Sequence, residues 1–290
     1  MFLENGAGRL VLVFVLAISF APRAHAASAC VWKITGPNGR NLFLGGSIHA
    51  LRNIDYPLPP AYNRAFDSSA RLAFEVDLKA LSDSSKSLIK SGQYPKGDSL
   101  KNHVDPRTYD YVRRVFALLK VPEEKFAQFR PWMLVLMLES PGLHGLSGNL
   151  GVDEFLERRA RANSKPMSGL ESVREHTEVF STLSDRQSEA LLLLTFIPHE
   201  HASEESERLM NAWRRGDVDT LAGMMRDSFR DFPAFGERLI GARNRRWIAK
   251  IEAFLGSGKT YFVVVGAAHM GGPEGLLTLL KARGYLVEQL

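Results

Sequence analysis

One short pattern, an apolar run followed by Gly-x-x-His, occurs near both ends of the 290-residue chain. Residues 42–49 read Leu-Phe-Leu-Gly-Gly-Ser-Ile-His, and residues 262–269 read Phe-Val-Val-Val-Gly-Ala-Ala-His. Continuous apolar runs are typical of strands buried on both faces of a sheet, and a terminal glycine lets the backbone turn without a Cβ clash. His49 and His269 would then follow the carboxyl ends of strands, where ligands bind in open α/β sheets. If the two strands are central, the imidazoles can converge.

The remaining pattern places strands at both ends of the chain and helices between them. Val31–Thr35 and Asn41–Leu44 flank a Pro-Asn-Gly turn and predict a hairpin, and residues 71–77 predict a short strand with an acidic end. Between about residues 80 and 256 apolar side chains recur mostly at helical spacing. We therefore predict an α/β fold with a small mixed central sheet, built from the N- and C-terminal segments, and a large helical insertion. Residues 27–290 would form a single domain.

Residues 1–26 have the pattern of a cleavable export signal. A head that carries Arg9 precedes the apolar residues 10–21, and an Ala-x-Ala cleavage site ends at Ala26. The apolar run is shorter than the roughly 20 residues that span a bilayer. A lipoprotein signal ending at Cys30 is the alternative, but polar residues separate the apolar run from that cysteine. We expect a periplasmic or secreted product that has no transmembrane helix.

Composition excludes several classes of protein. The chain is 45% hydrophobic and 24% charged, which is ordinary for a soluble globular protein and excludes collagen, coiled-coil rods and full-length disorder. A single cysteine excludes an intrachain disulfide framework. The 37 basic and 32 acidic residues are interspersed, so no basic stripe indicates a nucleic-acid partner. Composition leaves the oligomeric state open.

Two glutamates could complete a site with the paired histidines. Glu75 ends a predicted strand, and Glu171 follows an extended segment and a glycine. Two neutral imidazoles with one or two carboxylates suit divalent Mn, Co or Zn and leave room for a water. Such a metal lowers the pKa of the water and polarises a carbonyl, while a carboxylate that is not a ligand can act as general base. For Glu171, capping of the next helix is the alternative.

Other polar residues give weaker signals. His176 is expected on a solvated helix face, and His199 and His201 are expected in a surface turn after a proline. Arg243 belongs to a basic run, residues 243–247, that is most simply the charged face of a long helix. One member of that run could still reach the site.

Segments throughout residues 31–290 resemble the TraB/PrgY/GumN family. That resemblance implies kinship with Tiki-type metalloproteases, which carry paired Gly-x-x-His motifs and an essential glutamate. The resemblance also implies a more distant kinship with erythromycin esterase-like enzymes and with haem-binding ChaN-like proteins. The matching segments are residues 31–34, 43–49, 74–77, 151–153, 169–172, 213–217, 243–244, 266–276 and 283–287.

The sequence thus predicts an exported metal-dependent hydrolase whose substrates are peptides or proteins. Two alternatives stay open: a non-catalytic accessory or regulatory protein of polysaccharide export or signalling, and a module that binds haem or another ligand without turnover. By the resemblance, three residues match the presumed metal ligands and two further residues match recurrent positions. The predicted site comprises the metal ligands His49, His269 and Glu75, the catalytic candidates Glu75, Glu171 and Arg243, and the motif glycines Gly46 and Gly266 beside the cofactor.

Overall fold

The computed structural model describes residues 28–139, 150–196 and 202–290. The predicted export signal and the histidines at positions 199 and 201 lie outside these residues. The described chain forms a six-stranded sheet with the strand order β4-β3-β5-β2-β1-β6. The strands are β1 (Val31–Thr35), β2 (Asn41–Ser47), β3 (Arg71–Val76), β4 (Met167–Glu171), β5 (Tyr261–Gly266) and β6 (Leu286–Gln289).

The sheet is mixed, and its central strands come from opposite ends of the chain. β2, β5, β3 and β4 run parallel, whereas β1 is antiparallel to β2 and β6 is antiparallel to β1. β2 and β5 are direct neighbours, with Ser47 opposite Gly266. The predicted α/β class and mixed sheet are therefore confirmed. β4 is supplied from within the helical region, so the sheet is not built from the two ends alone.

Helices cover the sheet and also form a separate half of the molecule. α13 follows a four-residue helix, α12, through one π-helical turn, η5. None of the helices in the described ranges has both the length and the apolar character needed to cross a bilayer. The α-helices are α1 (Pro60–Ser68), α2 (Leu78–Asp83), α3 (Ser85–Ser91), α4 (Pro106–Leu118), α5 (Glu123–Phe126), α6 (Pro131–Leu138), α7 (Val152–Ala162), α8 (Val173–Ser181), α9 (Asp185–Leu194), α10 (Ala202–Arg215), α11 (Val218–Ser228), α12 (Pro233–Gly236), α13 (Ala242–Gly256) and α14 (Leu276–Lys281), and the shorter helical turns are η1 (Asn53–Asp55), η2 (Leu100–Asn102), η5 (Glu237–Gly241) and η6 (Ala267–His269).

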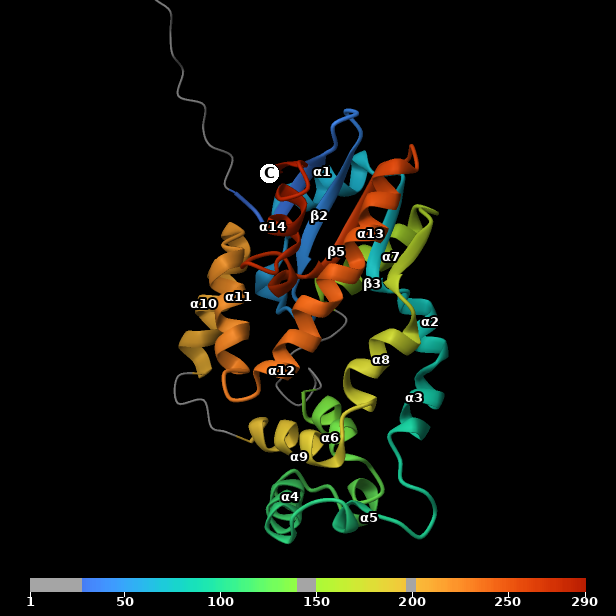
Figure 1. The fold of residues 1–290 in the computed structure, drawn as a ribbon, viewed down its shortest axis with the longest axis vertical. Helices are drawn as coiled ribbons and strands as arrows, with labels where there is room; N and C mark the ends of the chain where they lie inside the picture. Colours follow the sequence, from blue (N-terminus) through green and yellow to red (C-terminus); the bar gives the residue numbers. More distant parts are fainter. Residues whose placement is uncertain (1–27, 140–149, 197–201) are drawn as a thin grey trace, which may run out of the picture.

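Two hydrophobic cores stabilise these two halves. One core surrounds the sheet and includes Leu44, Phe262 and Trp247. The other joins the helices of the insertion and includes Trp132 and Phe235. In Figure 1 the β1–β2 turn lies at the top, so β2 runs downward, and α4, α5, α6 and α9 gather at the far lower end. The carboxyl ends of the parallel strands therefore face the boundary between the two halves.

Candidate metal centre

The carboxyl ends of β2, β3 and β5 bring the two Gly-x-x-His motifs together with Glu75. A Cβ atom on Gly266 would lie 3.2 Å from Glu75 Oε1, 3.6 Å from His269 Cδ2 and 3.9 Å from His49 Nε2. The bare Cα of Gly266 therefore leaves a small space that three polar side chains share. We call this space the cradle.

The unprotonated nitrogen of His269 is Nε2, which lies 3.2 Å from Nη1 of Arg243 and 3.7 Å from Oε1 of Glu75. Its Nδ1 lies 2.7 Å from Asn244 Oδ1, and the Asn244 amide nitrogen donates to the carbonyls of His269 and Glu274. The Asn244 oxygen can only accept, so Nδ1 of the imidazole carries the proton and Nε2 has the lone pair. Burial lowers the pKa of His269 to about 4. The imidazole is therefore neutral at physiological pH, as a metal ligand has to be.

His49 is held from the opposite side by a carboxylate. Its Nδ1 lies 3.0 Å from Oδ2 of Asp153, which stands in the first turn of α7. The charge of Asp153 raises the pKa of His49 to about 9. The His49 side chain is 67% exposed, so one side of the cradle is open to solvent. A carboxylate that binds one imidazole nitrogen and leaves the other free is the usual support of a metal-bound histidine.

The Glu75 carboxylate divides its two oxygens between different partners. Oε1 accepts the backbone N–H of Gly266 at 2.7 Å and lies 3.7 Å from His269 Nε2. Oε2 accepts Nη2 of Arg243 at 2.6 Å. Burial opposes ionisation of Glu75, but Arg243 and the two histidines outweigh it and hold the pKa of Glu75 well below its usual range. Glu75 is therefore a carboxylate, with Oε1 directed at the cradle.

Glu171 lies behind Glu75 and is saturated with donors. Its buried carboxylate accepts Nη2 of Arg243 at 2.6 Å, Nδ1 of His176 at 2.8 Å and Nε1 of Trp247 at 3.2 Å. Burial alone would raise the pKa of Glu171, but the hydrogen bonds from His176 and Arg243 lower it. A carboxylate that accepts this many donors anchors its neighbours and is a weak base.

The structure excludes the capping alternative for Glu171 and shows that the prediction for His176 is wrong. Ser172, and not Glu171, caps α8: its hydroxyl accepts the backbone N–H of Glu175, whose carboxylate accepts the backbone N–H of Ser172. His176 is not on a solvated face, because it donates to Glu171 at the sheet edge. α8 begins directly after β4, and its first turn carries His176 back over the end of that strand.

Arg243 does not belong to a charged helix face. Its side chain is 3% exposed, and its guanidinium stacks on the Trp247 ring with 4.6 Å between the guanidinium carbon and the ring centroid. Arg245, by contrast, pairs on the exterior with Glu237 and Glu274. The basic run therefore has one buried member at the site and at least one on the surface.

The two motif glycines face different surroundings. Gly266 faces the cradle, whereas a Cβ on Gly46 would collide with Cys30 Sγ and come within 3.0 Å of Ala267. The Gly46 carbonyl accepts the indole N–H of Trp213 at 2.9 Å. Gly46 thus closes the packing beneath the site, and its Cα faces away from the cradle.

The side chains at the cradle are of the types that bind a divalent cation, although among the described residues the set whose ligand atoms all lie within 4.8 Å of one another is Glu75, Glu171 and His176. Nδ1 of each histidine and Oε2 of Glu75 are bound by separate partners, Asp153, Asn244 and Arg243. Of the remaining atoms, Glu75 Oε1 also accepts the Gly266 N–H and His269 Nε2 lies 3.2 Å from Nη1 of Arg243. Two imidazole nitrogens and a carboxylate oxygen suit Zn, Mn or Co, which leaves the identity of the ion open.

Asp153 and Asn244 were not singled out as functional residues from the sequence. Asn244 is fully buried on the face of α13 that also carries Trp247, Ile248 and Ile251. A polar residue on an apolar helical face is the signal that could have identified it. Asp153 carries no comparable signal, because an acidic residue in a first helical turn is common for its effect on the helix dipole.

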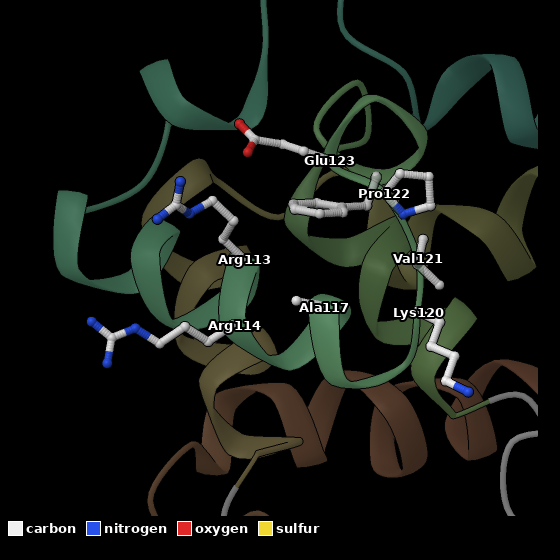
Figure 2. A pocket seen from close by; sticks show the side chains of 8 residues that line it. Arg113, Arg114, Ala117, Lys120, Val121, Pro122 and Glu123 are labelled. Atoms are coloured by element: carbon white, nitrogen blue, oxygen red, sulfur yellow. The ribbon is translucent and has the colours of Figure 1, made fainter.

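A large pocket lies elsewhere and includes none of these residues. It has a volume of about 630 Å³, and the residues that line it include Val121 and Phe126 of the helical half. Figure 2 shows that the Arg114 and Lys120 side chains extend away from one another. The pocket brings no set of polar groups to one point, so it lacks the feature that makes the cradle a candidate for chemistry.

The fold and the site define the class of protein: an α/β protein with two histidines and a carboxylate at the ends of parallel strands. The chain matches the TraB/PrgY/gumN family over residues 30–289 and belongs to that family. It is 24% identical to the uncharacterized protein YbaP of Escherichia coli K12, over 86% of this chain and 90% of YbaP. It is also 24% identical to the metalloproteases TIKI1 and TIKI2 of Danio rerio, over 85% of this chain but only 60% and 58% of those proteins. No solved structure matches the chain.

Proposed function

We propose that the protein is an exported metal-dependent hydrolase that acts on peptides or proteins, with His49, Glu75 and His269 as metal ligands. The observation that carries this proposal is that the side chains of His49, Glu75 and His269 meet at the bare Cα of Gly266, with Glu75 Oε1 3.7 Å from His269 Nε2. Kinship with two proteins named metalloproteases supports the choice of peptide bonds as substrate.

The surrounding residues prepare the donors for this role. A divalent cation in the cradle would polarise the scissile carbonyl and lower the pKa of a water molecule. Asn244 keeps the proton of His269 on Nδ1, and Asp153 holds Nδ1 of His49 in the same way. Arg243 orients Glu75 through Oε2 and keeps it ionised. The exposed side of His49 gives an extended substrate access to the cradle.

The decisive experiment measures metal content and cleavage together. Purified protein is analysed by mass spectrometry for bound metal and is assayed on a fluorogenic peptide library with added Mn, Co or Zn. We expect His49→Ala and His269→Ala to lose both metal and cleavage. The control is His103→Asn, which removes an imidazole that pairs with Asp98 and Asp185 in the helical half, and it should retain both.

Glu75→Gln separates the two roles of that carboxylate. A variant that loses metal shows that Glu75 is a ligand, whereas one that keeps metal and loses cleavage shows that it acts as general base. Wild-type protein that binds no divalent metal and cleaves nothing would contradict the proposal and favour an accessory role. A Soret absorption band would favour a haem-binding module.

Export is a separate part of the proposal and is supported by the pattern of residues 1–26. The surroundings of Cys30 argue against a lipid anchor, because its thiol is fully buried against β2. N-terminal sequencing of protein from the periplasm or medium should begin at Ala27. A membrane-bound product that retains residues 10–21, or a lipid on Cys30, would contradict this prediction.

A further inference from the structure

We propose that Arg243 occupies the place of a second cation, so that the centre takes one divalent ion and not two. The inference rests on the proposed function and concerns the inner side of the site, behind Glu75. There Glu75, Glu171 and His176 bring ligand atoms within 4.8 Å of one another. Judged by geometry alone, these three side chains could hold a metal ion of their own, with Glu75 shared between it and the cradle.

The Arg243 guanidinium already sits at the common contact of that set. Its Nη2 lies 2.6 Å from Glu75 Oε2, 2.6 Å from Glu171 Oε1 and 3.3 Å from His176 Nδ1. Nη1 of the same guanidinium donates to the Leu239 carbonyl at 3.2 Å and lies 3.2 Å from His269 Nε2, at the border of the cradle. A single nitrogen thus contacts the three residues that a second ion would use.

Charge explains why this place needs a cation at all. Glu75 and Glu171 are two largely buried carboxylates with one guanidinium between them. Buried charges persist only when they are paired, and arginine stays protonated under all physiological conditions. A divalent ion could not share the position, since it would lie against a fixed positive charge in a medium that screens poorly. The stack on Trp247 helps to hold the guanidinium in place.

Arg243 is therefore a positioning residue with a defined consequence for stoichiometry. It engages Oε2 of Glu75 and leaves Oε1 to the cradle. Its removal would leave two carboxylates and an imidazole without their cation. That set has the ligand chemistry of a divalent site, so the variant should acquire a second ion.

The experiment counts metal ions per chain by native mass spectrometry and by elemental analysis, with Mn, Co and Zn in turn. We expect about one ion in the wild type, about one in Arg243→Lys and about two in Arg243→Gln. The double variant Arg243→Gln, His176→Ala should return to about one, because it lacks a ligand of the inner set. Loss of a buried pairing partner destabilises proteins, so Arg243→Gln is purified both with and without metal.

Thermal melting gives a readout that does not depend on cleavage. Added metal should raise the melting temperature of Arg243→Gln more than that of the wild type, since ligand binding to the folded state stabilises it. Two ions in the wild type, or one ion in Arg243→Gln, would overturn the inference. A wild type without metal overturns the proposed function. If the wild type binds no metal but Arg243→Gln binds one ion and the double variant loses it, the inference about Arg243 is still supported. If neither variant binds metal, both the inference and the proposed function are overturned.

Discussion

The segments that follow β2 and β5 carry the same motif in opposite surroundings. His49 is exposed beside the charged Asp153, which raises its pKa to about 9. His269 is buried beside the neutral Asn244, and burial lowers its pKa to about 4. The motif sets where each imidazole lies, whereas its surroundings set its charge: Asp153 for His49 and burial for His269. His269 is therefore already neutral at physiological pH, whereas His49 has to release a proton before it can bind a metal.

A one-residue offset between the strands adds to this difference. Ser47, and not Gly46, stands opposite Gly266 in the parallel pairing of β2 and β5. The two glycines consequently point into different surroundings, one into the core and one into the cradle. Gly46 and Gly266 hold the same place in the sequence motif but do not occupy equivalent places in the sheet.

The largest expected effect separates the two histidines by stability. His269→Ala removes a buried ring and leaves the Asn244 oxygen without its donor, so it should cost about 2–4 kcal/mol of unfolding free energy. His49→Ala changes an exposed side chain and should cost less than about 1 kcal/mol. Urea unfolding of both variants in the presence of a chelator checks this. Equal losses would show that the two environments are energetically alike.

Alanine at each motif glycine should sharpen the same contrast. Gly46→Ala drives a methyl group into Cys30 and Ala267 and should cost about 1–3 kcal/mol through overpacking. Gly266→Ala places its methyl group beside Glu75 and His269 at near-contact distances and should change stability by less than about 1 kcal/mol. Metal affinity should show the reverse order, with the greater loss in Gly266→Ala. Unfolding and metal titration of the two variants test the pair, and a larger affinity loss in Gly46→Ala would contradict it.

Replacing the charged partner of His49 by an amide should bring the pKa of His49 closer to that of His269. Asp153→Asn removes the charge beside His49, so the pKa of His49 should fall from about 9 toward its ordinary value of 6.5. Once corrected for the protonation of His49, the metal affinity should fall by about 10- to 100-fold, as is usual when the partner of a ligand histidine is lost. NMR titration of the imidazole and calorimetry of metal binding measure the two effects. The exposed Asp83→Asn is a matched control that should change neither.

The pH dependence of stability should have opposite sign for the two histidines in metal-free protein. The pKa of His49 is raised to about 9, so its contribution is complete below pH 6.5 and is lost as the pH rises from 6.5 to 9. The pKa of His269 is lowered to about 4, so its contribution is complete above pH 6.5 and is lost as the pH falls from 6.5 to 4. Melting of each alanine variant against the wild type should show these windows. The His49 effect should be the smaller, because solvent screens an exposed pair.

The sequence was sufficient to locate the strand ends but not their partners. Apolar runs and terminal glycines are local signals, and they placed His49, Glu75 and His269 at one edge of the sheet. The burial of Arg243 and the contact of His176 with Glu171 depend on which face of a helix meets the sheet. That orientation is set by packing between distant segments, so local pattern alone assigned both residues to solvated faces.

The π-helical turn η5 has a consequence for how this family can vary in length. An α-helix turns about 100° per residue, so one residue more or fewer rotates everything beyond it by that amount. α13 is fixed on the sheet by Trp247 and Ile251, and η5 joins it to α12 and the second core. Deletion of one residue within 237–241 would turn α12 and the Leu239 carbonyl away from Arg243. Among members of the family, insertions and deletions should therefore be rarer in residues 237–241 than in the exposed loops, even where the residues of this turn are substituted.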